Sequence, residues 1–173
     1  LSGVGVGGTT SEDLVRYAHY EQFMRQSGCL CEEGGGMADI GCSRGGFIKY
    51  LATRQPGLSL AGVDCDIGSL KQLSETGLTA LSGDISALPL DDESWAILSY
   101  FHVLEHVYDF DRVLREAFRV LISGGKLLLE VPDAEHYGTP ECHVGVMFWA
   151  GMKEHVNHFS LKALVRLCER NGF

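Results

Sequence analysis

Apolar residues along the chain alternate between short continuous runs and longer stretches in which they recur every three or four positions. The runs predict buried strands, and the spaced stretches predict amphipathic helices. Strands are predicted at 37–39, 58–63, 78–81, 95–100 and 126–131. Helices are predicted at 11–26, after Gly45, at 67–76, at 111–122 and from Ser160 to Gly172. Strands that alternate with helices predict an α/β fold, a doubly wound parallel sheet with helices on both faces.

The helical spacing also predicts which side chains share a buried face. In the helix at 67–76 these are Ile67, Leu70 and Leu73, and in the last helix they are Leu161, Leu164, Val165 and Cys168. In the helix at 111–122 they are Val113, Leu114, Ala117, Phe118 and Leu121.

A glycine-spaced turn, Asp39-x-Gly41-x-x-x-Gly45, joins the first strand to the next helix. Glycines let the backbone turn sharply beside a ligand, and the amides at the helix start point into the same space. There is no Gly-Lys-Ser/Thr of a phosphate loop, and Ser43 stands where a dinucleotide fingerprint has its second glycine. The leading carboxylate favours a cofactor that carries positive charge. A glycine turn with only a structural use is the alternative.

Three consecutive predicted strands end in aspartate, at Asp39, Asp64 and Asp84. Ligands bind at the carboxyl ends of the strands in open sheets of this kind. Asp64 follows Asp39 by 25 residues, close to the spacing at which an acidic residue reaches ribose hydroxyls. The next strand ends at Phe101 and His102.

Composition narrows the function classes. The 173 residues suit one domain, which we expect at 11–173 after a flexible segment at 1–10. A formal net charge of −9 argues against nucleic acid as the main partner. No run is apolar enough to span a bilayer and no signal peptide is evident, so we expect a cytoplasmic location with the six cysteines reduced. Cys42 and Cys65 are expected to pack as small hydrophobes. A first residue other than Met suggests a processed or excised piece.

Several motifs in order resemble the class I S-adenosylmethionine-dependent methyltransferases, closest to their small-molecule branch of ubiquinone-pathway and sugar-modifying enzymes. The motifs are Ala38-Asp39-Ile40-Gly41-Cys42-Ser43-Arg44-Gly45, Gly62-Val63-Asp64, Gly83-Asp84-Ile85, Leu88-Pro89-Leu90-Asp91, His102-Val103-Leu104-Glu105-His106 and Gly124-Gly125-Lys126-Leu127. The resemblance implies S-adenosylmethionine as cofactor and a seven-stranded Rossmann-like sheet. Ser43 departs from the family glycine, and the last two strands are missing from this sequence.

The same resemblance implies roles for the residues at the strand ends. Asp39, Gly41 and Gly45 frame the methionine part of the cofactor, Asp64 binds the ribose hydroxyls, and Asp84 with Ile85 contacts the adenine. The neighbouring Cys42, Ser43, Cys65, Phe101 and His102 complete the predicted cofactor site. We expect no metal among the site residues.

A second cluster, Glu154-His155-Val156-Asn157-His158, precedes the last helix in a long irregular stretch at 132–159. Sugar C-methylating members carry a similar Glu-His before an aromatic-Ser pair. By that resemblance His155, Glu154 or His158 is catalytic, with His155 the first choice of base, and Met147-Phe148-Trp149 walls the substrate pocket. The alternative is that His155 only bonds loop carbonyls. His102 and His106 would share one face of a helix with Glu105 beside them.

The preferred function is methyl transfer from S-adenosylmethionine to an oxygen or carbon of a small-molecule acceptor. One alternative is a metal-assisted enzyme that methylates RNA ends, with His102, Glu105, His106 and a distal histidine as ligands. Another is a non-catalytic module that binds cofactor or a partner protein. Without the last two strands, a sheet edge is left exposed, and we expect self-association through it.

Overall fold

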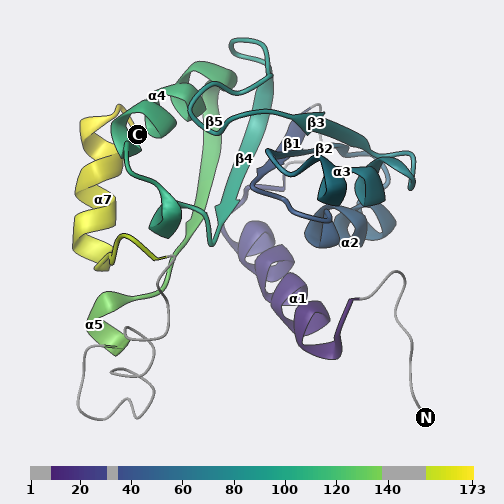
Figure 1. Cartoon of the computed structure of the whole chain (residues 1–173), viewed down its shortest axis with the longest axis horizontal. Coiled ribbons are helices and arrows are strands. Elements are labelled where there is room, and N and C mark those ends of the chain that lie inside the picture. The colour runs from purple at the N-terminus through teal and green to yellow at the C-terminus, as the bar shows by residue number, and fades with distance from the viewer. Residues whose placement is uncertain (1–8, 31–34, 138–154) are drawn as a thin grey trace.

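The computed structural model describes residues 9–30, 35–137 and 155–173, and its centre is a five-stranded parallel sheet (Figure 1). The order across the sheet is β3-β2-β1-β4-β5. The strands are β1 (Gly36–Ile40), β2 (Ser59–Asp64), β3 (Thr79–Ser82), β4 (Trp95–Phe101) and β5 (Leu121–Glu130). The order reverses between β1 and β4, which is the switch point where such sheets open a crevice for ligands.

Helices cover both faces of the sheet, which confirms the predicted α/β class. They are α1 (Ser11–Gln26), α2 (Gly46–Arg54), α3 (Ile67–Ser74), α4 (Phe110–Val120), α5 (Ala134–Tyr137) and α7 (Leu161–Arg170), with a 3₁₀ turn, η2, at Leu104–His106. In Figure 1 the helices α1, α2 and α3 lie to one side of the central strands, and α4 and α7 lie to the other.

Alternation along the strands divides the core between these two layers. Met37 in β1 packs with buried residues of α1, α2 and α3, among them Met24, Leu51 and Leu73. Its neighbour Ala38 points to the opposite face, where the core includes side chains of α4. Each strand is therefore buried on both faces, as a parallel sheet requires.

The sequence misplaced several helix positions. The fourth helix ends at Val120 and not at Ile122, because Leu121 already pairs with Trp95 as the start of β5. Ile67 and Phe118, both predicted to face the core, are 70% and 54% exposed. In α7 the side chains that pack on the core are Leu164 and Leu167. Leu161 and Val165 are exposed, and so is Cys65 after β2.

Two expectations about extent also change. The described residues form five strands and not the seven that the family resemblance implied. Within the stretch at 132–159 that was expected to be irregular, Ala134–Tyr137 forms the short helix α5. Thr10, expected in a flexible segment, caps α1 by accepting a hydrogen bond from the backbone of Asp13. Residues 1–8 and 138–154 lie outside the described residues.

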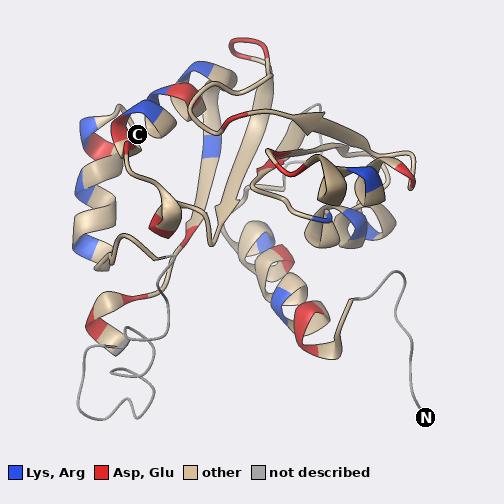
Figure 2. Cartoon of the chain, in the orientation of Figure 1, with Lys and Arg blue, Asp and Glu red and all other residues tan. Residues whose placement is uncertain are grey.

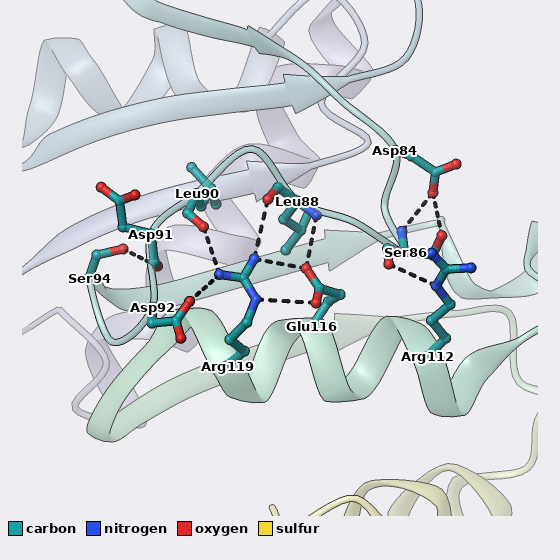
Figure 3. A network of polar contacts seen from close by, with 10 residues as sticks. All are labelled: Asp84, Ser86, Leu88, Leu90, Asp91, Asp92, Ser94, Arg112, Glu116 and Arg119. Carbon is teal, nitrogen blue, oxygen red and sulfur yellow. Dashed lines mark hydrogen bonds and ion pairs between the residues drawn. The ribbon is translucent and has the colours of Figure 1, made fainter.

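The loop between β3 and β4 is held against α4 by a network of polar contacts around Arg119 (Figure 3). The Arg119 guanidinium donates to the carbonyl oxygens of Leu88 and Leu90 and to the carboxylates of Asp92 and Glu116. Glu116 in turn accepts a hydrogen bond from the backbone of Leu88. These bonds satisfy backbone groups that the loop cannot pair within itself. In the described residues, no helix is both long and apolar enough to cross a membrane.

Candidate functional site

The glycine turn after β1 is fixed by its own backbone. The amides of Gly41 and Cys42 both donate to the carbonyl of Val63 in β2, at 2.8 and 3.1 Å. Gly41 and Gly45 have φ angles of 73° and 68°, a region that side chains with a Cβ rarely occupy. Ser43, in place of the family glycine, adopts the same left-handed region with φ 50°. The turn therefore keeps its shape despite this departure.

Asp64 links the turn to the end of β2. One carboxylate oxygen accepts a hydrogen bond from the Ser43 amide at 2.7 Å, and the other accepts one from the Asp66 amide at 2.8 Å. Each carboxylate oxygen has a second lone pair, so Asp64 can still accept hydrogen bonds from a ligand. The residue is half-buried at the carboxyl end of the sheet.

Asp39 is a buried acid beneath the same turn. Its side chain accepts a hydrogen bond from the Ser99 hydroxyl at 2.6 Å, and the residue is 6% exposed. Burial raises the pKa of Asp39 to about 7, and the nearby Asp64 carboxylate contributes in the same direction. A positive charge nearby would stabilise the ionised form of this carboxylate.

A cavity of about 240 Å³ opens above Asp39, and we call it the first cavity. Its walls are Arg16, Tyr17, Tyr20, Asp39, Gly41, Cys42, Ser43, Gly46, Phe47, Phe101 and His102. Aromatic rings form much of its lining: Tyr20 stacks on Phe101 with centroids 4.0 Å apart, and both lie against Phe47. A carboxylate below and aromatic rings beside it make a site that favours a cationic ligand.

Six predicted cofactor residues line this cavity, namely Asp39, Gly41, Cys42, Ser43, Phe101 and His102. The other five do not line it. Gly45 packs beside Leu73, Ile85 packs against the core, and Cys65 is exposed. Asp84 accepts hydrogen bonds from the backbone and hydroxyl of Ser86 and so closes its own turn (Figure 3). Asp64 borders the cavity only through Ser43.

Sequence reasoning missed the contribution of α1. Arg16, Tyr17 and Tyr20 line the first cavity from this helix, although the sequence had indicated them only as helix positions. The one available signal was that Tyr17 and Tyr20, three residues apart, share a helix face with an arginine beside them. Glu21 fixes this helix to α2, because its carboxylate accepts hydrogen bonds from the Tyr50 hydroxyl and the Gln55 amide.

His102 lies between the first cavity and a larger one of about 530 Å³, which we call the second cavity. Its Nδ1 is 3.2 Å from Glu105 and its Nε2 is 3.5 Å from Glu130. These two carboxylates, Glu105 first, raise the pKa of His102 to about 9. His102 is therefore protonated at neutral pH. It precedes η2, so it does not share a helix face with His106 as the sequence predicted.

The second cavity brings together residues from distant segments: Arg16, His102, Glu105, His106, Glu130, Val131, Pro132, Asp133, His136 and His155. The ring centroids of His106 and His155 are 4.8 Å apart in an edge-to-face arrangement. Desolvation lowers the pKa of His155, which keeps the ring neutral near pH 7.

Of the three predicted catalytic residues, only His155 lines a cavity. His158 is exposed and is not part of either cavity wall. Glu154, like the predicted pocket wall Met147-Phe148-Trp149, lies outside the described residues.

The comparison with family models decides the family. The model described as "Methyltransferase domain" matches residues 38–129, which run from the Asp39 turn to the end of β5. The chain belongs to this methyltransferase family. The match includes the glycine turn, all three strand-end aspartates and η2.

Relatives of this methyltransferase domain act on different substrates, to judge by their names. It is 28% identical over 121 residues to phthiotriol/phenolphthiotriol dimycocerosates methyltransferase of Mycobacterium leprae, covering 68% of this chain and 45% of that protein. It is 26% identical over 117 residues to sterol 4-C-methyltransferase of Caenorhabditis elegans, covering 58% and 35%. The chain thus spans less than half the length of these curated relatives.

Solved structures agree with the fold. A SAM-dependent methyltransferase from Thermotoga maritima superposes with a TM-score of 0.69 at 26% identity, covering 91% of this chain and 72% of that one. The Rossmann-like α/β fold of this methyltransferase domain is the one found in such enzymes.

Proposed function

We propose that this methyltransferase domain binds S-adenosylmethionine in the first cavity and transfers its methyl group to an oxygen or carbon of a small molecule in the second cavity. The observation that carries the proposal is the adjacency of the two cavities. Arg16 and His102 belong to the walls of both, so a donor and an acceptor would meet beside these residues.

The residues of the first cavity fit the cofactor chemically. The buried Asp39 carboxylate and the rings of Tyr20, Phe47 and Phe101 would favour a positively charged sulfonium. Asp64 would bind ribose hydroxyls through its remaining lone pairs while it holds the Ser43 amide. The cofactor supplies an activated methyl group, so the protein mainly has to align the acceptor and exclude water.

The second cavity supports a small acceptor that carries a hydroxyl or an acidic C–H. It is large enough for a compact molecule and presents a neutral imidazole, that of His155, which could accept a proton. Its carboxylates Glu105, Glu130 and Asp133 disfavour a phosphate backbone as ligand. In the described residues, lysines and arginines are spread over several helices and alternate with acidic residues (Figure 2).

The test uses S-adenosylmethionine with an isotopically labelled methyl group. The protein is incubated with separate panels of small hydroxylated molecules (sugars, phenols, sterols), with RNA and with protein. Label should enter a small molecule and depend on Asp64, so the Asp64→Ala variant should transfer less, whereas the exposed Asp91→Ala control should match the wild type. Label in RNA alone would favour the RNA-end alternative, and label in no panel despite cofactor binding would favour a binding module.

A further inference from the structure

Three side chains on the wall of the second cavity have the composition of a metal site. Glu105, His106 and His155 each offer one ligand atom, and these three atoms lie within 4.8 Å of one another. Around a tetrahedral ion with bonds of about 2.0–2.1 Å, ligand atoms are about 3.4 Å apart, so small side-chain rotations would complete the set. Two imidazoles and one carboxylate are ligands that suit zinc and neighbouring transition metals.

Glu105 provides an independent indication. The residue is 1% exposed, and its Oε2 atom is buried with no hydrogen-bond partner among the described residues. Its Oε1 atom is 3.2 Å from Nδ1 of His102. Burial works to raise the pKa of Glu105, but the hydrogen bond with His102 holds it below its usual range. A buried, ionised carboxylate with an unpaired oxygen is costly unless a cation compensates it.

The backbone explains why His155 lies beside this carboxylate. The amide of Asn157 donates to the carbonyl of Glu105 at 3.1 Å, and its side-chain amide donates to the carbonyl of Val107. Two residues further along, Phe159 is buried against Phe110. The segment 155–159 is thus attached directly to η2, and it places the His155 ring against that of His106.

We propose that Glu105, His106 and His155 bind one divalent transition-metal ion, of the zinc or manganese class, on the wall of the second cavity. His102 acts behind the first ligand, because its bond to Oε1 orients the Glu105 carboxylate so that Oε2 faces the ion. Three protein ligands leave coordination positions open toward the cavity, where an oxygen of the acceptor can bind. The proposal gives His155 the role of a ligand and not of a base, and it differs from the sequence expectation of a site without metal.

The metal site concerns the acceptor side of the proposed methyltransferase, but its test does not require turnover. Chelator-treated protein is titrated by calorimetry with Zn²⁺, Mn²⁺ and Mg²⁺, each alone. We expect one Zn²⁺ or Mn²⁺ per chain, with Mg²⁺ much weaker because it prefers oxygen ligands. Glu105→Gln and His155→Ala should each lower the affinity at least tenfold. His136→Ala removes an imidazole of the same cavity outside the cluster and should leave the affinity within twofold.

Two further measurements keep the outcome clear. Cys65→Ser in every protein removes the exposed thiol, which could bind Zn²⁺ by itself. If Glu105→Gln does not fold by circular dichroism, His155→Ala decides, since its ring lies on a surface segment. Wild-type protein without stoichiometric Zn²⁺ or Mn²⁺ binding, or affinity unchanged in the folded variants, would overturn the site. Titration with S-adenosylhomocysteine in the same samples separates this failure from failure of the cofactor proposal.

Discussion

The two cavities differ in how they are built. The first is formed around one short stretch, Asp39 to Phe47, whose shape is fixed by bonds to β2 and by two glycines in left-handed conformations. The second gathers η2, the end of β5 and the segment before α7, which are far apart in sequence. In the first, backbone geometry does most of the work. In the second, charged side chains face one another, and one buried oxygen of Glu105 has no partner in the described residues.

The difference suggests separate roles, one invariant and one adaptable. A site made from backbone and strand-end carboxylates can bind the same cofactor in many enzymes, whereas side chains from distant segments can be changed to suit an acceptor. Variants of the two cavities should therefore affect different measurements.

The largest effect is expected in the second cavity. His155→Ala should lower turnover about 10²–10⁴-fold, on the acceptor that the labelling assay identifies, because it removes either a base or a metal ligand. Affinity for S-adenosylhomocysteine should hardly change. Dependence of the wild-type rate on added Zn²⁺ or Mn²⁺ would distinguish the ligand from the base. Near-wild-type turnover in a folded variant would remove both roles.

In the first cavity, three glycines separate strain from steric conflict. An added Cβ at Gly41 would have unfavourable φ and would lie 2.6 Å from Val103 Cγ2, so Gly41→Ala should lower the free energy of unfolding by about 2–3 kcal/mol. Gly77 has φ 81° with open space around it, and Gly77→Ala should lose about 1 kcal/mol. Gly57→Ala, with neither problem, should stay within about 0.5 kcal/mol. Chemical denaturation measures all three. Equal losses would show that the turn is not the constraint we describe.

Asp64→Ala should weaken binding of S-adenosylhomocysteine at least tenfold, about 1.4 kcal/mol, because it removes hydrogen bonds from ribose hydroxyls to a charged acceptor. The control is Asp91→Ala, which changes an exposed carboxylate outside both cavities. Calorimetry that gives the same affinity for both variants would contradict the role of Asp64. Loss of zinc binding in Asp64→Ala would contradict the independence of the two cavities.

Asp39 should make stability depend on pH. In the unfolded chain it loses its proton near pH 3.8, whereas the folded protein holds it until about pH 7. Between these values the folded state binds more protons, so the contribution of Asp39 to stability is fully present below pH 3.8 and is lost as the pH rises through 7. Asp39→Asn should therefore gain stability relative to the wild type over this interval in thermal melts. A constant difference from pH 4 to 7 would mean that Asp39 ionises normally.

The smallest effect concerns the outer surface near α7. Phe118, Ile122, Leu161, Val165 and Phe173 are exposed, and β5 pairs only with β4 among the described residues. We propose that this side self-associates, as the sequence led us to expect. Val165→Lys should lower the association measured by sedimentation, whereas Val15→Lys, on α1, should not. Monomeric wild type at all concentrations would contradict the proposal.

How much of this was predictable follows the same division. The order of strands and helices and the glycine turn were predictable because each depends on local spacing, as at Asp39, Gly41 and Gly45. Ile67 and Phe118 were misplaced because a helix can be apolar on more sides than the sheet covers. The environment of His155 could not be predicted, since it depends on bonds from Asn157 to η2, about fifty residues earlier. For the same reason the sequence did not place α1 over the first cavity.

The central claim is that the first cavity binds the cofactor, and calorimetric titration of the wild-type chain with S-adenosylhomocysteine tests it most directly. We predict saturable binding of one molecule per chain, which the tenfold weaker Asp64→Ala variant then assigns to the end of β2. A folded wild-type protein that gives no heat of binding with S-adenosylhomocysteine, and no shift in melting temperature with S-adenosylmethionine, would contradict it.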